Sequence, residues 1–305
     1  MTTQLRTPTH SEPMRFTVLL DEAMKLLRRR GPKAFLALAG PVIVLQVIMV
    51  VVQVGGMRTM FEGIEEQNPD LTRVWSTVGW SCLFAFVASL VFLVAFAAIG
   101  KYSQDVVAGR DADVSTSWRF GLKPGVFGTQ LLASFFMGLS FIACLVGALY
   151  VVPALSLTVA VMVEEGLRGS AALTRSRDLA RYNPGRRFLD YPMTRILGLL
   201  FVSLLVSYAL AFVVQLPFSI AQQVIFFRSA VGSEGGQATL PTGALWLSVP
   251  SALFGAVAQM IAQFYLAFGL ALTYFDIRRR RDALDLEQAL DRLEGEAPPA
   301  GEPAS

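Results

Sequence analysis

Hydrophobic positions in this chain are collected into long runs and rarely alternate with charged ones. Five stretches exceed twenty residues without a single charged side chain, at 34–54, 76–100, 126–163, 196–227 and 244–275. About 20 helical residues cross the hydrocarbon layer of a membrane. Each run is long enough for at least one crossing, so the pattern predicts an all-α, polytopic membrane helix bundle.

The longest run, 126–163, fits either one crossing or two. The placement of Lys and Arg decides between them, because cytoplasmic loops are enriched in both residues. A six-span path places 23 of these residues on one side of the membrane and 3 on the other, whereas a five-span path divides them 12 to 14. We therefore predict six spans, two cytoplasmic termini and a hairpin that turns near Gly147 to Pro153. The short fourth span is expected to be tilted, partly re-entrant or shielded by its neighbours.

The predicted spans are 34–54, 76–100, 126–147, 150–164, 195–215 and 246–275, within one membrane domain at 14–290. Segment 14–30 has apolar residues at helical spacing and a basic end, which is typical of an amphipathic helix on the inner leaflet. A cytosolic helix docked on another loop is the alternative. The N-terminus 1–13 and the C-terminal tail 291–305 are expected to be disordered.

Composition narrows the chemistry that the chain can carry. Charged residues make up 16% of it, well below the roughly 25% of a soluble domain. His10 is the one histidine and lies in a polar stretch, while the two cysteines, Cys82 and Cys144, lie in apolar runs. This scarcity excludes Ser/His/Asp and Cys/His triads and two-histidine metal sites. We assign no catalytic, metal-binding or cofactor-binding residue, and we expect no cofactor and no nucleic-acid partner.

Polar positions within the hydrophobic runs are taken mainly by amides. A polar stripe recurs every four residues in the last span: Ser251, Gly255, Gln259 and Gln263. Small residues permit close helix approach and amides bond across helices, so the stripe favours helix–helix contact, with a substrate path as the alternative. Its candidate partners are Gln46, Gln53, Gln130 and Gln215. The runs contain no charged residue, which disfavours proton-coupled transport and intramembrane catalysis but not the passage of a lipid-like substrate.

Two expected cytoplasmic stretches carry more specific patterns. They are Val163-Glu164-Glu165-Gly166, followed by Ala171-Ala172-Leu173-Thr174-Arg175-Ser176-Arg177, and Tyr274-Phe275-Asp276-Ile277-Arg278, followed by Asp282-Ala283-Leu284-Asp285-Leu286. With them the chain resembles the membrane domain of some bacterial glycerophosphoryl diester phosphodiesterases and of stand-alone six-span relatives. It departs from that pattern at Phe275, Ala283 and Leu284. The resemblance implies a six-span fold in the bacterial inner membrane, and no catalysis, because the metal-binding barrel has no counterpart here.

The same two stretches carry opposite charges at one expected depth. Glu164 and Glu165 end the fourth span, and Arg175 is expected at the same level as the end of the last span. The hypothesis is a structural clamp between the last span and the loop after the fourth, made by Glu164, Glu165, Arg175, Asp276 and Arg278. Ordinary solvated charges on the cytoplasmic side are the alternative.

Function follows less directly from the sequence. The arginines at Arg278–Arg281 either attract anionic lipid headgroups or act only as stop-transfer charges. Membrane lipids and an unidentified membrane or cytoplasmic protein are the expected partners. The favoured hypothesis is a non-enzymatic scaffold, partner-binding or lipid-organising protein of the bacterial inner membrane, and the alternative is a transporter or lipid-handling permease. A closed core would favour the scaffold, whereas a cavity lined by Gln46, Gln259 and Gln263 would favour the permease.

Overall fold

The computed structural model describes residues 14–65, 71–143, 145–182, 191–232 and 245–295. It is 91% helical, and none of the described residues forms a strand. The helices are α1 (Phe16–Glu65), α2 (Leu71–Val107), α3 (Val114–Gly121), α4 (Pro124–Ala143), α5 (Leu145–Leu155), α6 (Thr158–Glu164), α7 (Ser170–Arg181), α8 (Pro192–Gly232) and α10 (Ser248–Gly295). Six stretches in these helices are long and apolar enough to cross a membrane. The predicted all-α membrane bundle is confirmed.

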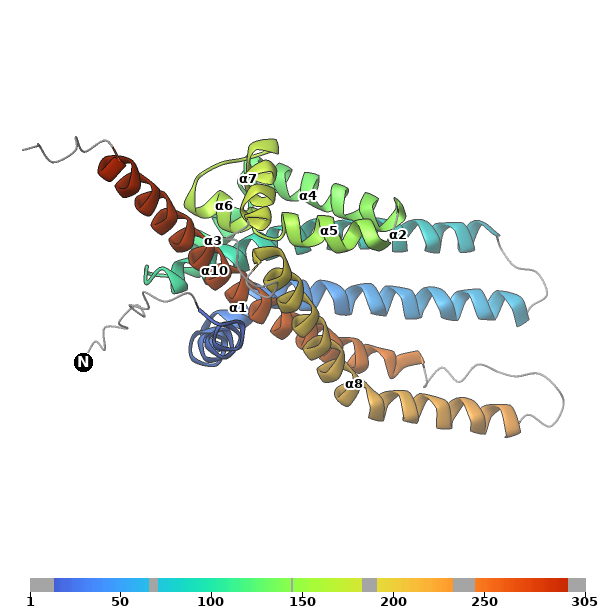
Figure 1. The fold of residues 1–305 in the computed structure, drawn as a ribbon. Helices are drawn as coiled ribbons and strands as arrows, with labels where there is room; N and C mark the ends of the chain where they lie inside the picture. Colours follow the sequence, from blue (N-terminus) through green and yellow to red (C-terminus); the bar gives the residue numbers. More distant parts are fainter. Residues whose placement is uncertain (1–13, 66–70, 144, 183–190, 233–244, 296–305) are drawn as a thin grey trace, which may run out of the picture.

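The spans run back and forth, so that α1 begins and α10 leaves the bundle at the same end, beside α3 and α7 (Figure 1). We call this the basic end, because it carries α3, α7 and Arg278–Arg281. The far end is where α1 and α8 finish. The disorder expected at 1–13 and 296–305 falls outside the described residues. At 291–295 the expectation was wrong, because α10 remains helical to Gly295.

The amphipathic segment 14–30 is the first part of α1 and continues into the first span. Figure 1 shows α1 changing direction, with its first turns seen nearly end-on. The helix contains Pro32 and Pro41, and proline bends a helix because it lacks a backbone donor. Leu19 and Ala23, on one face of the first turns, are fully buried in the bundle core. This segment therefore docks on the protein through its apolar face.

Pro41 leaves the carbonyl of Ala37, four residues earlier, without its usual helical donor. The indole Nε1 of Trp118 on α3 donates a hydrogen bond to that oxygen at 3.1 Å. Asp113 caps α3, because its carboxylate accepts from the Thr116 backbone nitrogen at 2.9 Å. Hydrogen bonds from the Ser115 hydroxyl and from Thr116 lower the pKa of Asp113. The short helix α3 thus supplies the hydrogen-bond donor that Pro41 denies to the Ala37 carbonyl in the first span.

The long third run folds as the expected hairpin, but the turn lies earlier than predicted. Helix α4 ends at Ala143 and α5 begins at Leu145, so Gly147 and Pro153 are inside α5. The fourth span is itself broken, since α5 ends at Leu155 and α6 starts at Thr158. Pro153 lies inside α5, before this break, so its missing backbone donor affects the preceding turn of α5 and not the junction with α6.

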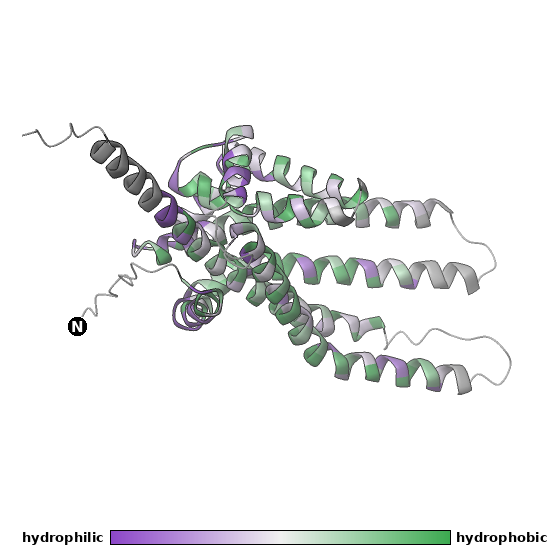
Figure 2. Cartoon of the chain, in the orientation of Figure 1, coloured by the Kyte–Doolittle hydropathy of each residue, from purple (hydrophilic) through white to green (hydrophobic). Residues whose placement is uncertain are grey.

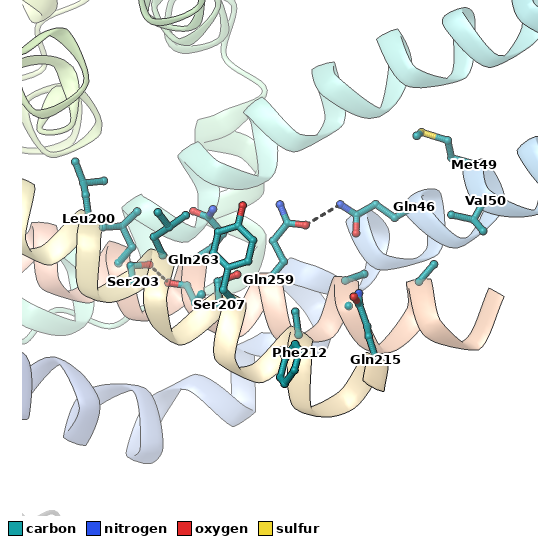
Figure 3. A pocket seen from close by; sticks show the side chains of 18 residues that line it. Gln46, Met49, Val50, Leu200, Ser203, Ser207, Phe212, Gln215, Gln259 and Gln263 are labelled. Atoms are coloured by element: carbon teal, nitrogen blue, oxygen red, sulfur yellow. Dashed lines mark hydrogen bonds between the residues drawn. The ribbon is translucent and has the colours of Figure 1, made fainter. Parts of the chain in front are cut away.

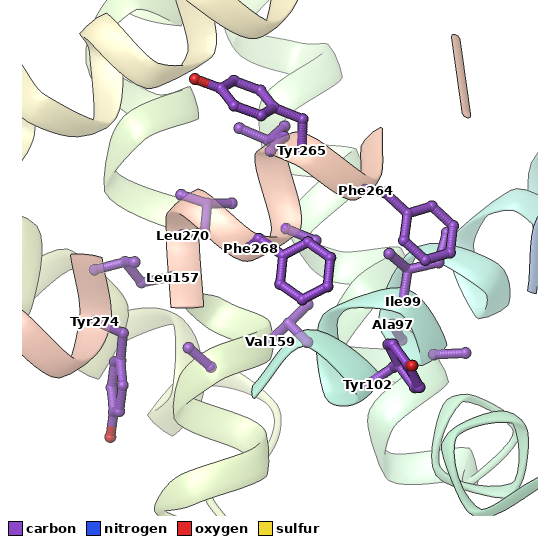
Figure 4. Packing of buried hydrophobic residues seen from close by; sticks show 14 of the residues in the cluster. Ala97, Ile99, Tyr102, Leu157, Val159, Phe264, Tyr265, Phe268, Leu270 and Tyr274 are labelled. Atoms are coloured by element: carbon purple, nitrogen blue, oxygen red, sulfur yellow. The ribbon is translucent and has the colours of Figure 1, made fainter. Parts of the chain in front are cut away.

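The densest packing lies toward the basic end and is centred on α10, the most buried of the six spans. Figure 4 shows its buried side chains among those of α2 and α6: Phe264, Phe268, Ile99, Tyr102 and Val159. A Cβ atom added at Gly269 would lie 2.5 Å from Cδ1 of Leu199 on α8. The helices approach closely there because glycine has no side chain. Figure 2 shows hydrophilic residues gathered at this end and hydrophobic residues along the spans.

Packing loosens toward the far end. On α10, Leu253 and Phe254 are 40% and 44% exposed, whereas residues from Phe264 to Tyr274 are buried. On α8, Phe212 and Val213 are also largely exposed. Figure 1 shows α1 and α8 ending apart from each other. The bundle is therefore compact at the basic end and opens between α1, α8 and α10.

Candidate functional site

A cleft of about 810 Å³ lies between α1, α8 and α10, within the spans. Its polar lining comprises Gln46 of α1, Ser203, Ser207, Tyr208 and Gln215 of α8, and Gln259 and Gln263 of α10. Apolar residues such as Leu200 and Phe212 complete the wall (Figure 3). Among the described residues that form the lining, none carries a charged side chain. The cleft is thus an amide- and hydroxyl-lined space at membrane depth.

Helical periodicity gathers these side chains. Ser203, Ser207, Ala211 and Gln215 are spaced four residues apart on α8 and share a face. Ala252, Gly255 and Ala256 of α10 are small, which leaves room opposite that face. A Cβ atom at Gly255 would clash with Nε2 of Gln215. Glycine at this position therefore lets the Gln215 amide reach the cleft.

The amides of the cleft are only partly used within the protein. Nε2 of Gln46 donates to Oε1 of Gln259 at 3.4 Å, a contact drawn in Figure 3. Oγ of Ser203 donates to the Ala262 carbonyl at 3.1 Å. Within the described part of the chain, no hydrogen bond to the side chains of Gln215 and Gln263 is found. Their donors and acceptors remain available to a molecule in the cleft.

Only part of the predicted polar stripe lines the cleft. Gly255, Gln259 and Gln263 line the cleft, whereas Ser251 does not. Of the candidate partners, Gln46 and Gln215 face the stripe, but Gln53 is absent from the lining and Gln130 is buried in α4. The residues of α8 that sequence reasoning missed, Ser203 and Ser207, show the same four-residue spacing as the stripe. That spacing was the signal that could have found them.

At the basic end, the structure rearranges the hypothesised clamp. Glu165 accepts a hydrogen bond from Nε of Arg175 at 2.8 Å and another from the Tyr274 hydroxyl at 3.1 Å. The last span is therefore joined to the segment after the fourth span, as the clamp requires, through the Tyr274 hydroxyl. Glu164 pairs instead with Arg110, in the segment between α2 and α3.

Asp276 also has partners that the clamp hypothesis did not name. Its Oδ2 lies 2.9 Å from Nη1 of Arg195 and 2.9 Å from Nη2 of Arg280, and its Oδ1 accepts from the Met14 backbone nitrogen at 3.2 Å. Arg280 is four residues away on the same helix face, where helical geometry favours an ion pair. Because Arg280 is held by Asp276, the cluster Arg278–Arg281 does not present four equivalent arginines to lipid headgroups.

A second ion-pair network ties α2 to α6. The Asp105 carboxylate of α2 forms ion pairs with Nζ of Lys101 at 2.6 Å and with Nε of Arg110 at 2.9 Å. Arg110 also forms an ion pair with Glu164. The hydrogen bond that Arg110 donates to the Glu164 carboxylate raises the pKa of the Arg110 guanidinium, while burial opposes that shift. Asp105 is buried, so this pairing offsets the cost of removing its charge from water. The network and the Asp276 cluster brace the compact end of the bundle.

No protein-family model, curated protein or solved structure matches this chain. The resemblance to the phosphodiesterase membrane domain therefore stays a prediction. In the described residues, no group of three or more His, Cys, Asp or Glu side chains is placed to hold a metal ion.

Proposed function

We propose that this protein is a non-enzymatic, lipid-handling permease of the bacterial inner membrane, and that the cleft holds the polar head of its lipid-like substrate. The observation that carries the proposal is the cleft itself, lined by Gln46, Gln259 and Gln263 at membrane depth. A cavity with this lining is the feature that separates the permease hypothesis from the scaffold hypothesis.

The exposure of the cleft lining supports a membrane-borne substrate. Tyr208 and Phe212, which line the cleft from α8, are 69% and 67% exposed on a hydrophobic span. A molecule in the surrounding bilayer therefore reaches the cleft from the side. An amphiphile places its polar head against the amides while its chains stay in the hydrocarbon. This arrangement satisfies amide groups that would be costly to leave unpaired in an apolar medium.

The chemistry of the lining supports an uncharged head. Amides and hydroxyls both donate and accept hydrogen bonds, as hydroxyl, ester and sugar groups do. A phosphate in the cleft would have no cationic partner in the described part of the lining, and an unpaired buried charge is strongly disfavoured. The volume of about 810 Å³ falls within the roughly 300–1,000 Å³ of small-molecule sites. The substrate class that fits is a lipid with a compact, hydroxyl-bearing head.

The placement of Lys and Arg supports a particular orientation of the protein in the membrane. The division of Lys and Arg, 23 against 3, favours the basic end in the cytoplasm and both termini with it. A topology reporter inserted after Tyr182, at the end of α7, tests this orientation. Activity only in the extracytoplasmic space would overturn it.

Reconstitution into liposomes tests the permease proposal. The measurement is the rate at which a fluorescent diacylglycerol analogue crosses the bilayer, compared with a phosphatidylglycerol analogue. Gln263→Leu removes one unsatisfied amide and is expected to slow diacylglycerol movement about fivefold, since one hydrogen bond contributes roughly 1 kcal/mol. Gln53→Leu, the same change outside the cleft, is the matched control and should leave the rate unchanged. Equal rates with protein-free liposomes would contradict the proposal.

The scaffold remains the second candidate, and the basic end favours it. The ion-paired clusters around Asp276 and Glu165 hold α6, α8 and α10 together. Such a braced surface suits a protein that positions a partner. Crosslinking in native membranes distinguishes the candidates: a reproducible protein partner combined with no lipid movement supports the scaffold.

A further inference from the structure

A second cavity, of about 730 Å³, lies on another side of the bundle, between α4, α5 and α7. Each helix contributes one face. On α4 the face contains Leu132, Phe136 and Leu139, and on α5 it contains Tyr150 and Ala154. Phe136 and Leu139 are 44% and 48% exposed, so the groove is open to the surroundings of the bundle. It shares no lining residue with the cleft between α1, α8 and α10.

One end of this groove is polar and cationic. Helix α7 turns Ser170, Thr174 and Arg177 toward it, at positions separated by about one turn each. Arg181, one turn further, lies with its guanidinium carbon 5.2 Å from the centre of the Tyr150 ring. The groove therefore combines apolar walls from two spans with hydroxyls and a guanidinium at the basic end.

The charge of Arg177 is only weakly compensated. Its Nε lies 3.8 Å from the Asp178 carboxylate, and both side chains are about half exposed. The phenol oxygen of Tyr150 is buried and has no hydrogen-bond partner among the described residues.

We propose that this groove binds one anionic phospholipid from the leaflet at the basic end. The phosphate sits against Arg177 and the hydroxyl of Thr174, and one acyl chain lies along the apolar faces of α4 and α5. The site is separate from the cleft of the proposed function. It binds an anionic headgroup, whereas the cleft binds an uncharged one.

The combination of walls and charge selects a lipid over a free phosphate ion. A soluble anion would use only the polar end and would leave the exposed apolar walls to other contacts. Burying an acyl chain on Phe136 and Leu139 adds the hydrophobic contribution that a free ion lacks. A zwitterionic lipid would fill the walls equally well but would bring a cationic group beside Arg177. The occupant is therefore expected to be anionic and to carry acyl chains.

Native mass spectrometry of the detergent-purified full chain tests the proposal. Phosphatidylglycerol and phosphatidylcholine are titrated separately, and inorganic phosphate is added as a competitor. Wild-type protein is expected to retain one phosphatidylglycerol about tenfold more tightly than phosphatidylcholine, as one charge-assisted hydrogen bond allows. Millimolar inorganic phosphate should not displace the lipid. Displacement by inorganic phosphate would show that the site binds any phosphate anion, and it would overturn the proposal that the acyl chain contributes to binding.

Three variants locate the binding. Arg177→Gln should abolish the preference for phosphatidylglycerol, whereas Arg119→Gln, the same charge change at an exposed residue of α3 outside the groove, should keep it. Gly147→Leu fills the groove, because a Cβ atom there meets nothing closer than 3.7 Å, and should weaken both lipids. Equal behaviour of Arg177→Gln and Arg119→Gln would overturn the proposal. Loss of lipid movement in Gln263→Leu would leave these results unchanged, so the two sites fail independently.

Discussion

The carboxylate of Asp276 is a buried charge at the compact end of the bundle. It accepts from Arg195 and Arg280 at 2.9 Å each and from the Met14 backbone at 3.2 Å. The side chains of Arg195 and Asp276 are only 5% and 8% exposed. Asp276→Asn removes the negative charge and leaves two guanidinium groups facing each other with little water. Removing one partner of a buried pair costs about 3–5 kcal/mol of unfolding free energy.

The assay is reversible unfolding in mixed micelles, followed by helical circular dichroism. Asp111→Asn, the same change at an exposed residue between α2 and α3, is the matched control and should be nearly neutral. Arg195→Leu should cost less than Asp276→Asn, because Arg280 still neutralises the carboxylate. If Asp276→Asn lowers the unfolding free energy by less than about 1 kcal/mol, as an exposed pair would, the cluster is not buried in the way described.

Two further substitutions test the packing around the first and last spans. Gly269→Ala places a Cβ atom against Leu199 and should lower the unfolding free energy by about 1–3 kcal/mol, whereas Gly40→Ala, with open space around it, should be neutral or stabilising. Equal changes in unfolding free energy for the two variants would contradict the close contact between Gly269 and Leu199. Trp118→Phe removes the hydrogen bond to the Ala37 carbonyl and should cost about 1 kcal/mol. The α1 amides should exchange faster with solvent in this variant. Unchanged hydrogen exchange would show that the Trp118 hydrogen bond does not stabilise α1.

The number of spans could be predicted from the sequence because it depends on local quantities. Run length gives the candidates, and the Lys and Arg asymmetry divides the 126–163 run into two crossings. The position of the turn could not be read in the same way. Gly147 and Pro153 are common turn residues, yet both lie inside α5. The break in the fourth span falls after Pro153, between α5 and α6.

Half of the cleft was visible in the sequence. The four-residue spacing of Gly255, Gln259 and Gln263 marked one wall, because a helix places such residues on one face. Which helix stands opposite depends on three-dimensional packing, so Gln215 and Gln46 could only be candidates. The buried partner of Asp276 was less accessible still. Arg195 belongs to an arginine-rich segment, and no sequence pattern separates the one arginine that is buried from those that are solvated.

Whether the cleft between α1, α8 and α10 binds a lipid with an uncharged head is decided by identifying the lipid that stays bound to the purified protein. Wild-type protein and Gly255→Leu, which fills the cleft from α10, are purified in the same detergent, and the retained lipids are extracted and identified by mass spectrometry. We expect about one neutral, hydroxyl-bearing lipid per wild-type chain, as for a single small-molecule site, and we expect Gly255→Leu to lose it. Retention of the same lipid by both proteins, or of none by the wild type, would contradict it.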